Sequence, residues 1–217
     1  LGVRVAEIAN EEVEPMRTPK QTAADWPTLA ATASPEAIRA ALDGGAEIDA
    51  TDTQGRTAIL IAAKVNRLDI VRLLIDAGAD IDIQDQISLN PFLWGCISGN
   101  LELVRLMVEA GTDLDRHTRF DGVGIHPPAE KGHVEVVRYL AEQTDINVNH
   151  TNLCGWTPLL EAIILRDGGP VQQEIVRLLL DAGADPTMVD QWGVSPLAHA
   201  QEKGFAEIAE MLSAALA

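Results

Sequence analysis

The chain has 217 residues, of which 47% are hydrophobic and 23% are charged, a composition typical of soluble folded proteins. Sixteen Lys and Arg against 33 Asp and Glu give a net charge of −17, which repels phosphate backbones, so we expect no nucleic-acid partner. No apolar run approaches the about 18 residues that a membrane helix needs, and we expect no membrane insertion.

The amino-terminal segment differs from the remainder of the chain. Residues 1–21 contain Pro15 and Pro19 and share no pattern with residues 22–217, so we predict an arm or an extra capping helix there. From residue 22 to residue 217 we predict a single domain. Its first part, residues 22–52, contains the sequence Trp26-Pro27-Thr28-Leu29 and is expected to cap the amino end.

The domain is built from a repeated segment. The stretches that begin at Asp69, Glu102 and Glu174 nearly coincide over twelve residues, and weaker copies begin at Glu36, Glu135 and Glu207. The equivalent positions upstream are spaced by 33, 33, 34 and 38 residues, and they are Gly55, Ser88, Asp121, Gly155 and Gly193. A fixed period of this length indicates a stack of small helical units.

Two of these units begin with a family motif. The sequences Gly155-Trp156-Thr157-Pro158-Leu159 and Gly193-Val194-Ser195-Pro196-Leu197 resemble the G-x-T-P-L start of an ankyrin repeat, in which Thr or Ser caps a helix that begins with Pro. The chain thus resembles bacterial ankyrin-repeat domain proteins. The resemblance implies an all-α solenoid of about six helix-turn-helix repeats with β-turn fingers. The predicted repeats are residues 22–52, 53–85, 86–118, 119–151, 152–190 and 191–217.

The second helix of each unit carries a buried stripe, for example Ile70, Val71, Leu74 and Ile75. Glycines such as Gly78 follow these helices and are expected to end them in the left-handed conformation. Acid–arginine pairs three residues apart recur on the second helices, and we interpret them as a solvated, mildly stabilising face. These pairs are Glu36 with Arg39, Asp69 with Arg72, Glu102 with Arg105, Glu135 with Arg138, and Glu174 with Arg177.

The resemblance to ankyrin-repeat proteins implies a binding surface on the concave side, formed by the fingers and the exposed side of each first helix. Carried onto this chain, the family register gives the candidate partner-binding residues Arg56, Ile87, Leu89, Arg119, Phe120, Glu130, Lys131, Trp156 and Trp192. Phe120, Trp156 and Trp192 lie on consecutive fingers, and an exposed column of large aromatic side chains is typical of an interface. The alternative is that these rings pack on neighbouring fingers.

The centre of the array departs from the pattern. Repeat four contains Pro127 and Pro128 where its first helix is expected, which should break or delay that helix. The same repeat has Gln143-Thr144 in place of the glycine that ends the second helix. Repeat five carries an insertion, Arg166 to Gln173, that should lengthen the turn between its helices, either as a recognition loop or as a tolerated surface loop.

Catalytic and metal-binding signals are weak. Neither G-x-S-x-G nor H-E-x-x-H occurs. Acid pairs such as Asp80 with Asp82 recur at the repeat period, which makes them finger residues rather than a calcium loop. His117, His150 and Cys154 lie near the fingers without ligand spacing, and the family register gives His126 a structural hydrogen bond. We therefore predict no catalytic residues, no metal and no cofactor.

The favoured function is a non-enzymatic scaffold that binds another protein, with a basic partner surface suggested by the net charge. A small-ligand binder or enzyme that uses His126, Glu130, Trp156 and Glu161 is the first alternative. The second is self-association; a monomer is favoured and a homodimer is the alternative. A cytoplasmic location is favoured, and because the chain does not begin with Met, an exported or periplasmic one is the alternative.

Overall fold

The computed structural model describes residues 26–217, and the predicted arm at residues 1–21 lies outside them. The described part is all helical, with six helix pairs and no named strand. The elements are η1 (Trp26–Ala31), α1 (Pro35–Asp43), α2 (Ala58–Lys64), α3 (Leu68–Asp76), α4 (Pro91–Ser98), α5 (Leu101–Glu109), α6 (His126–Lys131), α7 (Val134–Gln143), α8 (Pro158–Ile164), α9 (Pro170–Asp181), α10 (Pro196–Glu202) and α11 (Ala206–Ala215). The predicted all-α stack of helix-turn-helix units is confirmed.

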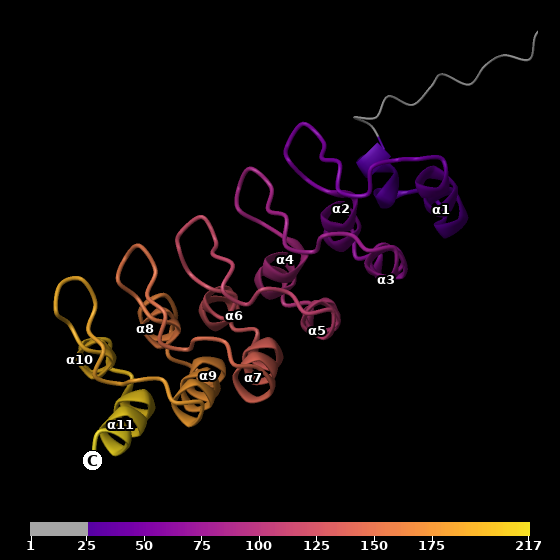
Figure 1. The fold of residues 1–217 in the computed structure, drawn as a ribbon. Coiled ribbons are helices and arrows are strands. Elements are labelled where there is room, and N and C mark those ends of the chain that lie inside the picture. Colours follow the sequence, from indigo (N-terminus) through magenta and orange to yellow (C-terminus); the bar gives the residue numbers. More distant parts are fainter. Residues whose placement is uncertain (1–25) are drawn as a thin grey trace, which may run out of the picture.

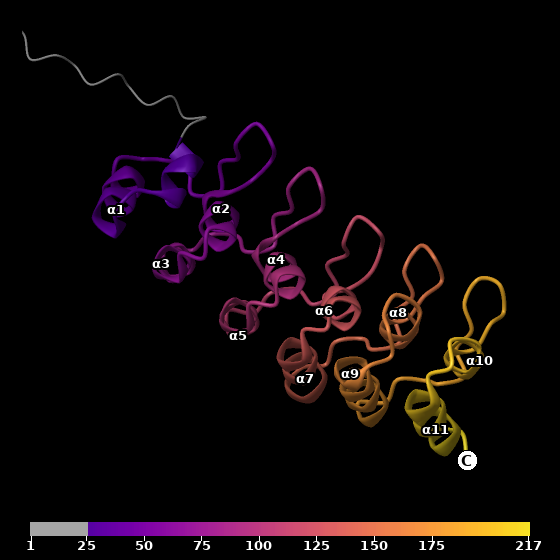
Figure 2. The ribbon, with the colours of Figure 1, turned by 180° about the vertical axis from the view of Figure 1, so that it is seen from behind.

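The pairs stack side by side in chain order (Figure 1). The first helices η1, α2, α4, α6, α8 and α10 form one row, the second helices form another, and the fingers all project on the side of the first row (Figures 1 and 2). The core lies between the rows. Ile70, Val71 and Leu74 of α3 are fully buried there, as the apolar stripe of the second helices predicts, whereas Ile75 of the same stripe is only half-buried.

The ends of the helices follow the expected chemistry. The Thr157 hydroxyl accepts a hydrogen bond from the Leu160 amide at 3.2 Å, and Ser195 accepts one from Ala198 at the same distance. Asn90 serves the same purpose for α4, because its side-chain oxygen accepts from Leu93 N at 2.8 Å. After α3, Gly78 adopts φ of +86°, a left-handed conformation that glycine reaches at little cost.

The irregular first helix of repeat four is delayed, as its prolines predict. Helix α6 begins at His126, so Pro127 and Pro128 occupy its first turn, where the missing amide donors have no helical partner to lose. Its N-cap residue, Ile125, makes no side-chain capping bond. At the end of the same repeat the Thr144 hydroxyl donates to the Leu140 carbonyl at 2.6 Å, which ends α7 without a glycine.

The acid–arginine pairs behave differently from the prediction. Ion pairs at three-residue spacing join Glu135 to Arg138 at 3.8 Å and Glu174 to Arg177. Other contacts of these arginines reach the next repeat instead, because neighbouring second helices lie within reach of a long guanidinium side chain. Those contacts are Arg72 to Glu102 at 3.5 Å, Arg138 to Glu174 at 2.7 Å, and the Arg105 guanidinium 5.3 Å from the centre of the Tyr139 ring.

The insertion in repeat five does more than lengthen a turn. Part of it forms the first turn of α9, which begins at Pro170 and has 12 residues, whereas α3 and α5 have nine. The remaining loop braces both neighbouring repeats. Arg166 Nε donates to the Glu130 carbonyl of repeat four at 2.5 Å, and a Cβ at Gly168 would collide with the ring of Phe205 in repeat six.

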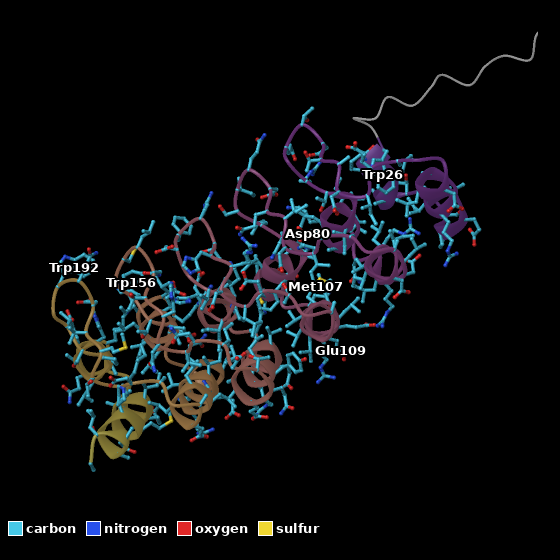
Figure 3. All side chains as sticks on the ribbon, in the orientation of Figure 1. Trp26, Asp80, Met107, Glu109, Trp156 and Trp192 are labelled. Atoms are coloured by element: carbon cyan, nitrogen blue, oxygen red, sulfur yellow. The ribbon has the colours of Figure 1, made fainter. Side chains whose placement is uncertain are left out.

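The first described element is η1, a 3-10 helix in place of the first α-helix of repeat one. Trp26 is 4% exposed, and its indole nitrogen donates to the Glu47 carbonyl at 2.7 Å. Figure 3 shows this ring at the opposite end of the array from Trp192. No helix within residues 26–217 is long and apolar enough to cross a membrane.

Candidate functional site

Each finger is shaped by one polar side chain at its base. In four fingers the Oδ1 atom of an Asp or Asn accepts hydrogen bonds from the backbone amides two and four residues later, at 2.8–3.1 Å. These residues are Asp52, Asp85, Asn152 and Asp190. Repeat four has Thr118 there, with longer bonds of 3.4 and 3.3 Å to Phe120 and Gly122.

Acidic side chains also join successive fingers. Asp49 accepts from the amide of Asp80 at 2.9 Å, and Asp82 accepts from the amide of Asp113 at 3.1 Å and from the Thr112 hydroxyl at 2.6 Å. These bonds satisfy backbone donors between repeats. The Asp80–Asp82 pair is therefore a structural element of the fingers, as the recurrence of such pairs predicts.

We use the name finger face for the surface formed by the fingers and the adjacent sides of the first helices. Its centre is hollowed by a cavity of about 340 Å³ between repeats three, four and five. The lining residues combine an apolar part with charged and polar groups: Ile87, Leu89, Ile97, Thr118, Arg119, Phe120, Gly122, His126, Pro127, Glu130, Lys131, Asn152 and Glu161. Ligand sites commonly have this mixture of apolar wall and few polar groups.

Six of the nine candidate residues line this cavity, namely Ile87, Leu89, Arg119, Phe120, Glu130 and Lys131. Phe120 is 56% exposed and Ile87 49% exposed, and the Arg119 guanidinium lies 4.6 Å from the centre of the Phe120 ring. Leu89 is 7% exposed, which corrects the expectation that it is a surface residue. Its amide is bound to Asp85, and this draws the side chain under the finger.

The remaining three candidates lie elsewhere. Arg56 forms an ion pair with Asp52 of its own finger at 2.6 Å. Trp156 and Trp192 lie on neighbouring fingers towards one end of the array (Figure 3). Trp192 is 67% exposed, whereas the indole nitrogen of Trp156 is buried without a hydrogen-bond partner. No ring–ring contact joins Phe120, Trp156 and Trp192, so within the described chain these aromatic residues do not form a continuous column.

Two carboxylates approach each other on the polar side of the cavity. Glu161 is 8% exposed and accepts a hydrogen bond from Asn152 Nδ2 at 2.6 Å. Burial, together with the nearby negative charge of Glu130, raises the pKa of Glu161 to about 7. Glu130 itself lies 3.5 Å from the Arg166 guanidinium of the insertion.

Asn152 is a cavity residue that sequence reasoning missed. Three other fingers have an aspartate at the equivalent position, namely Asp52, Asp85 and Asp190. The replacement of this aspartate by asparagine is the sequence signal that could have identified Asn152. An Asp there would face Glu161 with a second negative charge, whereas the amide of Asn supplies a donor. In repeat six the equivalents of Asn152 and Glu161 are Asp190 and His199. There the acid is retained and its partner is a histidine, whose ring nitrogen lies 2.9 Å from Asp190.

His126 completes the cavity. It is 3% exposed, its Nε2 lies 3.2 Å from the Trp156 carbonyl, and its Nδ1 is buried without a partner. Burial lowers its pKa to about 4, so the ring is neutral at pH 7. His126, Glu130 and Glu161 thus converge in one cavity, yet no hydrogen bond joins the histidine to either carboxylate. The arrangement fits ligand or side-chain recognition better than a proton relay.

Comparisons with known proteins agree on the family. The family model "Ankyrin repeats (3 copies)" matches residues 28–118, 92–190 and 125–215. The ankyrin repeat protein YahD of Escherichia coli strain K12 is 48% identical over 90% of this chain and 98% of its own length.

Two solved structures are similar over much of the chain. An ankyrin repeat domain from Acinetobacter baumannii AYE has a TM-score of 0.84 and 41% identity, covering 88% of this chain and 96% of its own. The ankyrin repeat protein EF0377 has a TM-score of 0.82 and 35% identity, covering 88% of this chain and 97% of its own. Ankyrin repeats are generally protein-interaction modules without catalytic activity, and this chain belongs to the ankyrin-repeat family.

Proposed function

We propose that the chain is a non-enzymatic scaffold that binds another protein on the finger face, with the central cavity receiving an anchor side chain of the partner. The observation that carries this proposal is the cavity of about 340 Å³ beneath the exposed side chains of Phe120 and Ile87. Interfaces concentrate their binding energy where an apolar side chain lies beside a pocket from which water is excluded.

Charge defines the kind of partner. The net charge of −17 attracts a basic surface at a distance. Inside the cavity Glu130 offers a carboxylate, and the carboxyl group of Glu161, with a pKa of about 7, is ionised more readily beside an approaching cation. A lysine or arginine side chain of the partner would place its apolar stem against Phe120 and its cationic end at these carboxylates. Trp192, with 67% of its surface exposed, extends the same face towards the carboxy-terminal repeat.

The convergence of His126, Glu130 and Glu161 favours a second candidate, the binding of a small ligand. In that case the cavity is filled by a free molecule with a cationic group and an apolar part. Self-association through the finger face is a further outcome, which sedimentation separates from both.

The test is capture of partners from a native lysate by the wild-type protein and by Phe120→Ala, followed by mass spectrometry. Leu216→Ala is the matched control. Leu216 is also apolar and is 44% exposed, but it directly follows α11, away from the fingers. A protein retained by the wild type and by Leu216→Ala but lost from Phe120→Ala supports the proposal. Identical capture by all three forms contradicts it.

The two alternatives have their own measurements. Sedimentation of the wild-type protein as a dimer that Phe120→Ala converts to a monomer would indicate self-association. A rise in melting temperature with small amines, abolished by Glu161→Gln, would indicate a small-ligand site.

A further inference from the structure

Three side chains with metal-binding chemistry meet between the fingers of repeats four and five. His117 and His150 lie on successive fingers, 33 residues apart in the chain, and their ring centres are 4.7 Å apart. His117 Nδ1 lies 2.7 Å from Asp121 Oδ1. One ligand atom from each of His117, Asp121 and His150 lies within 4.8 Å of the other two.

The backbone at Asp121 provides an independent observation. Its φ is +64°, a left-handed conformation, and the equivalent residues of three other fingers are glycines, Gly55, Gly155 and Gly193. A side chain at such a position is disfavoured relative to glycine. The same substitution places a carboxylate against His117, where a glycine finger would have none.

A hydrogen bond orients the second histidine. His150 Nε2 lies 2.6 Å from the backbone carbonyl of Asp121, so the ring is tied to the residue that supplies the carboxylate. Metal-binding histidines are commonly oriented by bonds of this kind to nearby carbonyl groups. Both histidines are half-buried and Asp121 is half-exposed, which leaves an ion a route from solvent.

We propose that His117, Asp121 and His150 bind a divalent transition metal ion such as zinc. Two imidazoles and one carboxylate match the ligand preferences of zinc, and three protein ligands leave a position for water or for a group of a bound partner. No ligand motif is visible in the sequence here, because the ligands come from two separate fingers.

A metal at this place would act on the cavity. Thr118, Arg119 and Phe120 lie between His117 and Asp121 in the chain and line the cavity. The ion would therefore fix the finger that carries Phe120 to the next finger, the one that carries His150. The proposal is independent of which partner the finger face binds.

The experiment is titration of the untagged, metal-free chain with zinc chloride at pH 7.5 by calorimetry, together with NMR of the histidine ring protons. We expect one ion per chain, with shifts at His117 and His150 and none at His199, which pairs with Asp190 at the far end. His117→Ala and Asp121→Gly should each weaken zinc binding at least about tenfold.

The glycine substitution separates metal binding from folding. Asp121→Gly removes a ligand but relieves the left-handed strain, so the metal-free variant should melt at or above the temperature of the wild type. Ser88→Gly is the matched control, because Ser88 has φ of +60° at the same place in another finger and should bind zinc like the wild type. Absence of saturable zinc binding, or unchanged affinity in both His117→Ala and Asp121→Gly, would overturn the proposal.

Discussion

Glu161→Gln tests whether burial of the Glu161 carboxyl group in the cavity lowers the stability of the folded protein when that group is ionised. The pKa of Glu161 is raised to about 7 from the ordinary value of 4.5 because the side chain is buried beside Glu130. Between pH 4.5 and pH 7, Glu161 of the folded protein holds a proton that the unfolded chain has released. The contribution of Glu161 to stability is thus complete below pH 4.5 and is lost as the pH rises through 7.

The magnitude follows from the same values. A gap of about 2.5 between the two pKa values, at about 1.36 kcal/mol for each pH unit, corresponds to a loss of up to about 3 kcal/mol at pH 8. Gln has nearly the same shape as Glu, carries no charge, and keeps an oxygen that can accept from Asn152 Nδ2. We therefore expect Glu161→Gln to match the wild type near pH 4.5 and to exceed its free energy of unfolding by up to about 3 kcal/mol at pH 8.

The assay is urea denaturation of both proteins across this pH range, followed by circular dichroism. Glu102→Gln is the control, because the Glu102 side chain is 68% exposed and should show no comparable growth of the difference with pH. His126 titrates in both proteins and cancels in the comparison. If the difference between Glu161→Gln and the wild type is the same at both ends of the range, the burial argument is refuted.

Three further changes examine neighbouring parts of the structure. Asn152→Asp should lower stability at pH 8 by about 1–3 kcal/mol, with recovery towards pH 5, because a carboxylate replaces the amide that donates to Glu161; urea denaturation measures both. Gly168→Ala should cost about 2 kcal/mol, because the new Cβ meets the Phe205 ring and the φ of +70° disfavours it; thermal melting measures this loss. The pKa of His126, lowered to about 4, means that stability falls as pH drops from 6.5 towards 4, and His126→Gln should flatten this fall in acid denaturation.

The fold was predictable because its signals repeat. The spacing of Gly55, Ser88 and Asp121 counts the units, and the Thr157-Pro158 start identifies their helices. Each unit contacts mainly its neighbours, so a local pattern is enough to define the whole architecture.

Contacts between repeats were harder to predict. The i, i+3 rule describes an isolated helix, whereas Arg72 contacts Glu102 of the next repeat. Leu89 looked exposed by register, yet the bonds of its finger to Asp85 bury it. The cavity likewise depends on how three fingers stand relative to one another, and no single segment of the sequence carries that information.

The groups that lower stability are concentrated in repeats four and five. Helix α6 has no side-chain cap, whereas the other described first α-helices, α2, α4, α8 and α10, each have one. His126 and Trp156 each bury an unpaired nitrogen, and Glu161 is buried with a raised pKa. In a stack of repeats, regular neighbours can stabilise an irregular centre through their shared interfaces. Asn152 shows that this centre is not merely poorly packed, because it supplies a donor to the buried carboxyl where other fingers have Asp. Polar groups held at a cost around one cavity are characteristic of a recognition site, and their position beneath Phe120 is the physical reason to look for the partner there.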